Sequence, residues 1–197
     1  MILLDNEPIS VPKFISAQKL LKDKFVLEFS NNDENNRKIR KTIELTIGDI
    51  ACFVKPHSDF VCDTIVRAIL PKRHNGLESP TVYVLVTDNK FDFYNITEIA
   101  EKKYKILDRT LKNVIVQRVF TIHQLAHFLI KELEIDLEKY KSKLLVITGD
   151  FFLSDPQITK RHKDWLYPQL LKAIKKVKDS VILVFSLTKL STLVNYE

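Results

Sequence analysis

Short apolar runs rich in β-branched residues alternate with amphipathic helical patterns from about residue 42 onward. Several runs are hydrophobic at nearly every position, which is typical of strands buried on both faces of a parallel sheet. The expected strands are 42–47, 50–54, 81–87, 113–119, 143–148 and 180–186. The expected helices are 59–70, 92–104, 121–134 and 163–177. This alternation predicts an α/β fold with a doubly wound, mainly parallel sheet flanked by helices.

The last expected helix, 163–177, has an apolar side and a lysine-rich side. We assign four residues to its apolar face: Leu170, Leu171, Ile174 and Val177. Four lysines lie largely off that face: Lys172, Lys175, Lys176 and Lys178. Solvation is the first interpretation of such a face, and contact with phosphate groups is the alternative.

The first 41 residues have a different character. The run 24–29 predicts an edge strand, and the asparagine-rich segment 30–41 predicts a polar loop. We therefore divide the chain into an N-terminal arm with an edge hairpin, 1–41, and a core domain, 42–197.

Glycine is the informative part of the composition, because the 197 residues contain only 3. They stand at Gly48, Gly76 and Gly149, too far apart to build a glycine-rich loop that cradles phosphate. Cys52 and Cys62 form no metal-binding motif, and we expect both to be buried core residues of a reducing compartment. With no apolar run long enough to span a bilayer, we expect a cytoplasmic protein, nucleoid-associated or nuclear according to its source.

The formal net charge of +6 permits nucleic-acid binding without requiring it. The best candidates for phosphate contacts are clusters in the arm and after the first core helix. These residues are Arg37, Lys38, Arg40, Lys41, Lys72 and Arg73. Any DNA binding through them is expected to be electrostatic and independent of sequence.

The order of segments resembles the ATPase core of RecA-like recombinases, specifically the archaeal RadA and eukaryotic Rad group. The run GDIACFVKPHSDFVCDTIVRAILP is similar to the strand, phosphate loop and helix that open that core. The Walker A octapeptide falls without a gap on 55–62, from Lys55 to Cys62. Both glycines are missing, Val61 replaces the lysine, and Cys62 replaces the threonine.

The resemblance continues through three further runs. In TVYVLVTDNKFDFYNITEIAEKK, Asp88 stands where the family keeps the glutamate that orients the attacking water. The run LDRTLKNVIVQRVFTIHQ resembles the next strand and its His-Gln pair. LLVITGD occupies the Walker B strand, where Thr148 replaces the magnesium-site aspartate and Asp150 lies two residues further on. The closing strand ILVFSLT lacks the family's polar sensor.

The arm carries a possible docking motif. PKFISAQKLL resembles the family's F-x-x-A polymerisation motif, which adds a strand to a neighbouring ATPase core, with Phe14 and Ala17 as its anchors. A short amphipathic helix packed on the protein's own core is the alternative.

The resemblance implies a noncatalytic, RecA-like paralogue that acts as an accessory or mediator in homologous recombination or DNA repair. Its expected partners are a recombinase or another paralogue, in a hetero-oligomer or homo-oligomer, with single-stranded or double-stranded DNA as a further ligand. We predict no catalytic residues, no cofactor and no metal, since a phosphoryl-transfer site needs the missing lysine and metal ligands.

Two alternatives stay open. One is an enzyme with an atypical nucleotide or metal site built on Asp88 and Asp150. Lys55 and His57 are separate candidates for holding an anion at the N-terminus of the first core helix. The other is a stand-alone, basic nucleic-acid-binding module. A zinc pair at His123 and His127, or a hydrolase built from Cys62, His57 and Asp150, lacks any supporting motif.

Overall fold

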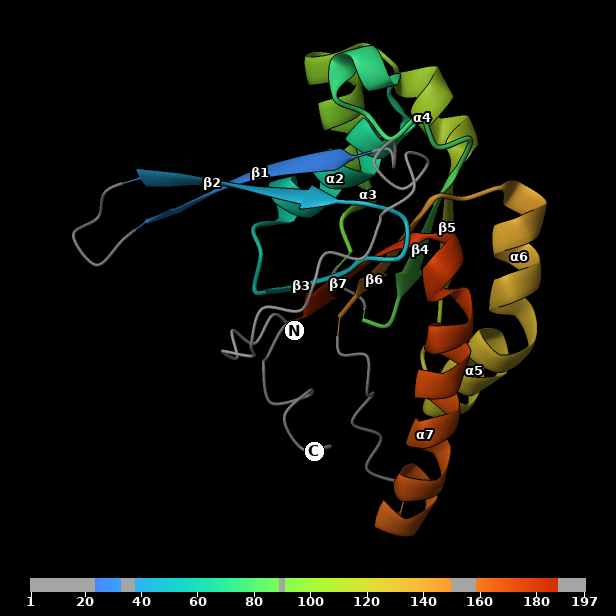
Figure 1. Cartoon of the computed structure of the whole chain (residues 1–197). Helices are drawn as coiled ribbons and strands as arrows, with labels where there is room; N and C mark the ends of the chain where they lie inside the picture. Colours follow the sequence, from blue (N-terminus) through green and yellow to red (C-terminus); the bar gives the residue numbers. More distant parts are fainter. Residues whose placement is uncertain (1–23, 33–37, 89–90, 150–158, 188–197) are drawn as a thin grey trace, which may run out of the picture.

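The computed structural model describes residues 24–32, 38–88, 91–149 and 159–187. Its centre is a sheet of five strands with helices on both faces (Figure 1). The strands are β3 (Ile50–Val54), β4 (Val82–Val86), β5 (Val114–Arg118), β6 (Leu144–Thr148) and β7 (Ile182–Leu187). Every neighbouring pair is parallel, in the order β3-β7-β6-β4-β5. The predicted α/β class with a parallel, doubly wound sheet is confirmed.

Helices cover the two faces of the sheet in two groups. One face carries α2 (Ser58–Ile69), α3 (Phe93–Ile99), the π-helical turn η2 (Ala100–Tyr104) and α4 (Leu107–Asn113). The opposite face carries α5 (Ile122–His127), the π-helical turn η3 (Phe128–Glu132), α6 (Leu133–Tyr140) and α7 (Lys160–Val177). Two 3-10 turns precede strands: η1 (Lys72–His74) and η4 (Lys178–Ser180).

Alternate residues of the central strands pack into two separate hydrophobic cores, one on each face of the sheet. In β4, Val82, Val84 and Val86 pack toward α2, whereas Tyr83 and Leu85 pack toward the α7 side. Both sets are fully or nearly fully buried. This explains the continuous apolar runs in the sequence, because a strand buried on both faces has no polar side.

The arm forms a hairpin that reaches further into the chain than expected. Strands β1 (Phe25–Asn32) and β2 (Lys38–Leu45) pair antiparallel in a sheet of their own, from Phe25 opposite Leu45 to Asn32 opposite Lys38. The predicted loop 30–41 is therefore mostly strand, and the boundary placed at residue 41 falls inside β2. Arg67 of α2 donates to the Val26 carbonyl at 2.7 Å, which ties the hairpin to the core.

Three other local expectations were wrong. Helix α4 was missed because its seven residues are too few to show a clear period. Leu171 is 40% exposed, since it lies about 100° around α7 from the fully buried Leu170. Cys52 is exposed rather than buried, because β3 is an edge strand; Cys62, at 2% exposure, is buried as expected.

The topology creates a crevice at the carboxyl ends of the strands. The helix that follows β4 is α3, which packs on one face of the sheet. The helix that follows the neighbouring strand β6 is α7, which packs on the other face. Adjacent strands whose connections leave to opposite faces mark the switch point at which ligands bind in open α/β sheets. None of the helices in the described part of the chain is long and apolar enough to cross a membrane.

Candidate functional site

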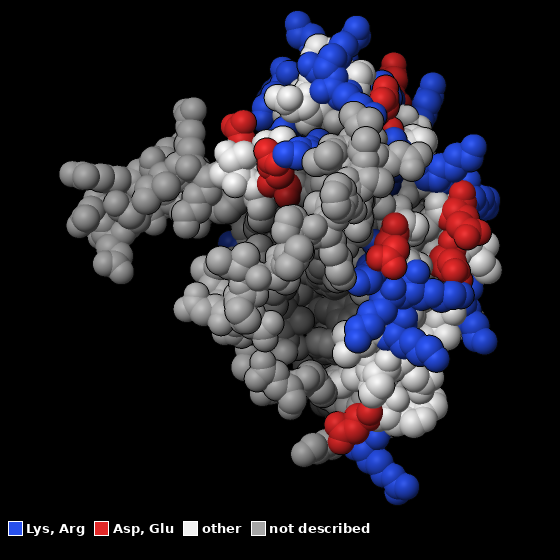
Figure 2. Space-filling view, in the orientation of Figure 1, with Lys and Arg blue, Asp and Glu red and all other residues white. Residues whose placement is uncertain are grey.

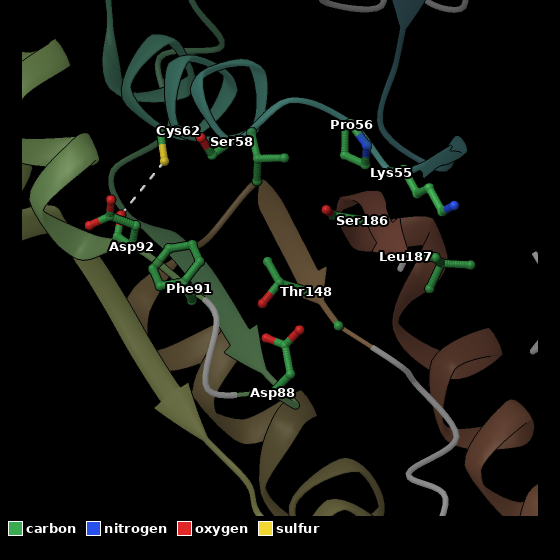
Figure 3. Close-up of a pocket in the computed structure, with 12 residues that line it drawn as sticks. Lys55, Pro56, Ser58, Cys62, Asp88, Phe91, Asp92, Thr148, Ser186 and Leu187 are labelled. Carbon is green, nitrogen blue, oxygen red and sulfur yellow. Dashed lines mark hydrogen bonds between the residues drawn. The ribbon is translucent and has the colours of Figure 1, made fainter. Parts of the chain in front are cut away.

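A pocket of about 360 Å³ opens at this crevice, between the carboxyl ends of β3, β4, β6 and β7 and the start of α2 (Figure 3). That volume lies in the range of small-molecule sites. Its lining residues are Lys55, Pro56, Ser58, Val61, Cys62, Asp88, Phe91, Asp92, Thr148, Gly149, Ser186 and Leu187. Positions that the resemblance assigns to one degenerate nucleotide site therefore lie together, although more than 90 residues separate Lys55 from Thr148.

Backbone bonds fix the strand ends that form the pocket floor. Thr87 donates to the Thr148 carbonyl twice, from its amide at 3.0 Å and from its hydroxyl at 2.9 Å. The Gly149 amide donates to the Ser186 carbonyl at 2.9 Å. Gly149 has φ +89°, and a Cβ there would lie 2.7 Å from Cγ of Asp88, so only glycine lets these two strand ends approach.

The start of α2 is closed by its own residues rather than left open for phosphate. His57 is the N-cap, and its Nδ1 accepts from the Asp59 amide at 3.4 Å. The Phe60 amide donates to the His57 carbonyl at 3.0 Å, and Asp59 supplies the negative charge that the helix dipole favours. Lys55 adopts φ +49° and its side chain points away from Asp88 and Thr148 (Figure 3). The expected anion ligands, Lys55 and His57, therefore do not converge on a phosphate position.

Cys62 is held as a neutral thiol. Its Sγ donates to the Asp92 carbonyl at 3.8 Å, and burial, reinforced by Asp92, Asp59 and Asp63, raises its pKa to about 12. A nucleophilic cysteine needs the opposite shift, toward the thiolate. The shift at Cys62 is therefore opposite to the one that the hydrolase considered above would need.

Thr148 carries the most unusual polar atom of the pocket. The residue is only 6% exposed, and its Oγ1 has no hydrogen-bond partner among the described residues. Figure 3 shows the side chains of Thr148 and Asp88 directed toward one another across the pocket. An unpartnered buried hydroxyl costs stability, so its presence beside a cavity marks a position at which a ligand atom would be favourable.

The structure brings only part of the predicted site together. The degenerate-loop residues Lys55, Val61, Cys62, Asp88 and Thr148 line the pocket. Asp150, Phe14, Ala17 and Arg37 lie outside the described residues.

The basic candidates are dispersed. Lys38, Arg40 and Lys41 are residues of the hairpin strand β2. Lys72 and Arg73 are exposed in η1, which precedes β4 and so lies toward the amino ends of the strands, away from the pocket.

Other residues complete the pocket, and local sequence patterns carry only a weak signal for them. Asp92 caps α3 by accepting from the amides of Tyr94 at 2.9 Å and Asn95 at 3.3 Å, and this capping pattern could have been recognised in FDFYN. Ser58, Phe91 and Ser186 line the pocket only because of the strand order, which no local pattern reveals.

The described residues contain no cluster of three potential metal ligands. His127 pairs with Glu132 at 3.0 Å, and the His123 ring packs against His162, with 5.3 Å between centroids. The two histidines thus have separate neighbours.

Charge is spread over the helices instead of concentrated at the pocket. Figure 2 shows Lys and Arg side chains gathered over the helices at the top and right of the molecule, interleaved with Asp and Glu. Lys103 pairs with Asp63 and Lys102 with Glu98 on one side, and Lys176 pairs with Glu134 on the other. Such pairs lower the net positive field of these surfaces.

No protein-family model matches the chain, and no curated protein is significantly similar to it.

Proposed function

We propose that this protein is a noncatalytic, RecA-like paralogue of the recombinases that acts by binding a recombinase or another paralogue. The observation that carries the proposal is the convergence of Lys55–Cys62, Asp88 and Thr148 on one pocket. The resemblance implies this convergence of three distant segments, and the parallel sheet produces it by bringing the carboxyl ends of its strands to one edge.

The chemistry of the pocket supports a binding role over a catalytic one. Val61, Cys62 and Thr148 stand where a phosphoryl-transfer site needs a lysine, a metal-bound hydroxyl and an aspartate. The amides at the start of α2 are engaged by His57, and Cys62 is a neutral thiol. Nothing at these positions supplies the positive charge that stabilises a transferring phosphoryl group.

The partner is engaged, in this proposal, by the arm. Phe14 and Ala17 would dock on a recombinase core as an added strand, while Arg37, Lys38, Arg40 and Lys41 contact DNA phosphates. Arg67 of α2 contacts Val26 and Phe25 of β1, so the described hairpin strands pack on the α2 side of the core.

Affinity capture of the recombinase from the source cell tests the proposal. Phe14→Ala should weaken binding about ten-fold to a hundred-fold, since burial of one Phe contributes roughly 1.5–3 kcal/mol. Ala17→Glu should act similarly, and Ile15→Ala, on the opposite side of an extended segment, is the matched control. Capture of no RecA-fold protein, or a large fall in melting temperature with Phe14→Ala and intact capture, contradicts the proposal.

Nucleotide binding provides a second test. Calorimetry with magnesium-ATP should give no saturable heat, and the melting temperature should stay constant. Micromolar binding that is lost in Asp88→Ala would instead favour the second candidate function.

That second candidate is an enzyme with an atypical site, and the unpartnered hydroxyl of Thr148 facing Asp88 is the observation that favours it.

A further inference from the structure

The edge strand β3 lacks, within its own five residues, the features that usually protect a sheet edge. Exposed edges commonly carry charged residues, proline or a bulge, which prevent pairing with another chain. The five residues of β3, IACFV, contain none of these, whereas the other edge strand, β5, ends in Gln117 and Arg118.

The side chains of β3 form an apolar stripe along this edge. Ile50 is 45% exposed and Val54 is 38% exposed, with the exposed Cys52 between them. These residues stand beside Leu183, Phe185 and Leu187 of β7 on the sheet face that bears α7. An exposed apolar row beside an open backbone edge favours addition of a further strand.

The hydrogen bonds to β7 show which backbone groups of β3 face outward. The Leu183 amide donates to the Asp49 carbonyl at 3.0 Å, and the Lys55 amide donates to the Leu187 carbonyl at 2.7 Å. In a parallel ladder the residues of one strand face its neighbour alternately. The amides and carbonyls of Ile50, Cys52 and Val54 therefore point away from β7, and no described strand is hydrogen-bonded to them on that side.

We propose that β3 pairs antiparallel with β3 of a second copy of this chain, which joins two five-stranded sheets across a two-fold axis at Cys52. In this register Ile50 and Val54 of one copy exchange backbone hydrogen bonds with Val54 and Ile50 of the other. Cys52 pairs with itself. All three outward-facing residues of each copy are then used, and a shift of register in either direction leaves some of them unpaired.

Size and charge in β3 fit this self-pairing. On the α2 side, small Ala51 stands opposite large Phe53, whose ring packs on Phe60 with 4.7 Å between centroids. The flanking charges take no part in this register, because the Asp49 carboxylate accepts from Thr46 and Lys55 leaves the extended conformation at φ +49°. The strand itself carries no charge, so no like charges meet when it pairs with an antiparallel copy of itself.

This inference is independent of the proposed partner, so the purified full-length chain tests it alone. Light scattering over a concentration series should show the mass rising from 23.0 kDa toward twice that value. Cys52→Lys places two ammonium groups on the axis and should weaken the dimer ten-fold or more. A mass that remains monomeric at every concentration overturns the proposal, including the case in which another part of the same chain covers β3.

A charge-exchange series tests the register. Ile50→Lys and Val54→Glu should each weaken the dimer about ten-fold, and the double variant should restore it, because each new lysine then faces a new glutamate. Gln117→Lys, which puts the same charge on the opposite edge strand, is the matched control and should leave dimerisation unchanged. Circular dichroism and melting temperatures establish that each variant is folded. A dimer that is insensitive to the two single changes, or that is not restored in the double variant, overturns the proposed register.

Thiol cross-linking gives an independent readout. Paired residues across an antiparallel ladder have Cα atoms about 5.5 Å apart, within the disulfide range. Diamide, which takes up the two hydrogens as the two Cys52 thiols join, should give a disulfide-linked dimer. Cys62→Ser should keep that product and Cys52→Ser should abolish it. Failure of the wild-type chain to cross-link contradicts the self-pairing.

Discussion

The loops at the two ends of the parallel sheet line cavities of different character. At the carboxyl end, residues from β3, β4, β6 and β7 converge on a pocket with a buried hydroxyl, a carboxylate and an obligatory glycine. At the amino end, a cavity of about 430 Å³ is lined by charged side chains such as Lys141, Lys143 and Lys176, and Glu134 pairs with Lys176. The buried Thr148 hydroxyl, which has no partner among the described residues, and the close packing at Gly149 set the first end apart, whereas solvated charges at the second tolerate change.

The largest expected effect comes from the tightest contact at the carboxyl end. Gly149→Ala combines a positive φ with a Cβ 2.7 Å from Asp88 and should lower the free energy of unfolding by about 2–4 kcal/mol. Gly48→Ala is the matched control, because φ is +102° but the nearest atom to a Cβ is 4.0 Å away, so only about 1–2 kcal/mol is expected. Urea unfolding measures both, and equal losses would refute the close packing of Gly149.

The second effect is the pH dependence due to Cys62. Because its pKa is raised from 9.0 to about 12 in the folded chain, the stabilisation is complete below pH 9 and is lost as the pH rises toward 12. The free energy of unfolding should fall by about 1.4 kcal/mol by pH 10 through this group alone. Cys62→Ala should be less stable at neutral pH but should show a correspondingly smaller decline between pH 8 and pH 10. Identical declines in the two proteins would contradict burial of the thiol.

The sequence predicted much of the sheet and only part of the site, for physical reasons. Runs such as 82–86 and 144–147 are apolar and buried throughout, so the sequence reports the burial of these strands at every position. The strand order is set by tertiary packing, and no local pattern showed that β3 is an edge. For that reason Cys52 was misplaced, and Ser186 was missed as a pocket residue.

The third effect compares Thr148, which lines the pocket, with Thr87, which is bonded to it. Thr148→Val removes a buried hydroxyl that has no partner among the described residues, so it should be neutral or stabilise the fold by about 1 kcal/mol. Thr87→Val, the same chemical change, removes the bond to the Thr148 carbonyl and should destabilise by about 1 kcal/mol. Thermal unfolding compares them. Loss of stability in Thr148→Val would show that its hydroxyl is satisfied in the folded protein.

The smallest effect is expected at the amino end. The side chains of Lys176 and Glu134 are 65% and 43% exposed, and exposed ion pairs contribute about 0.2–1 kcal/mol. Lys176→Ala should therefore change the free energy of unfolding by less than about 0.5 kcal/mol. A double-mutant cycle with Glu134→Ala isolates the pair, and Lys172→Ala, whose residue has no ion-pair partner in the described part of the chain, is the control. Raising the salt concentration should reduce the coupling, because solvent ions screen exposed charges. A coupling above about 2 kcal/mol that resists salt would mean that this end is also built around a desolvated site, and the contrast between the two ends of the sheet would fail.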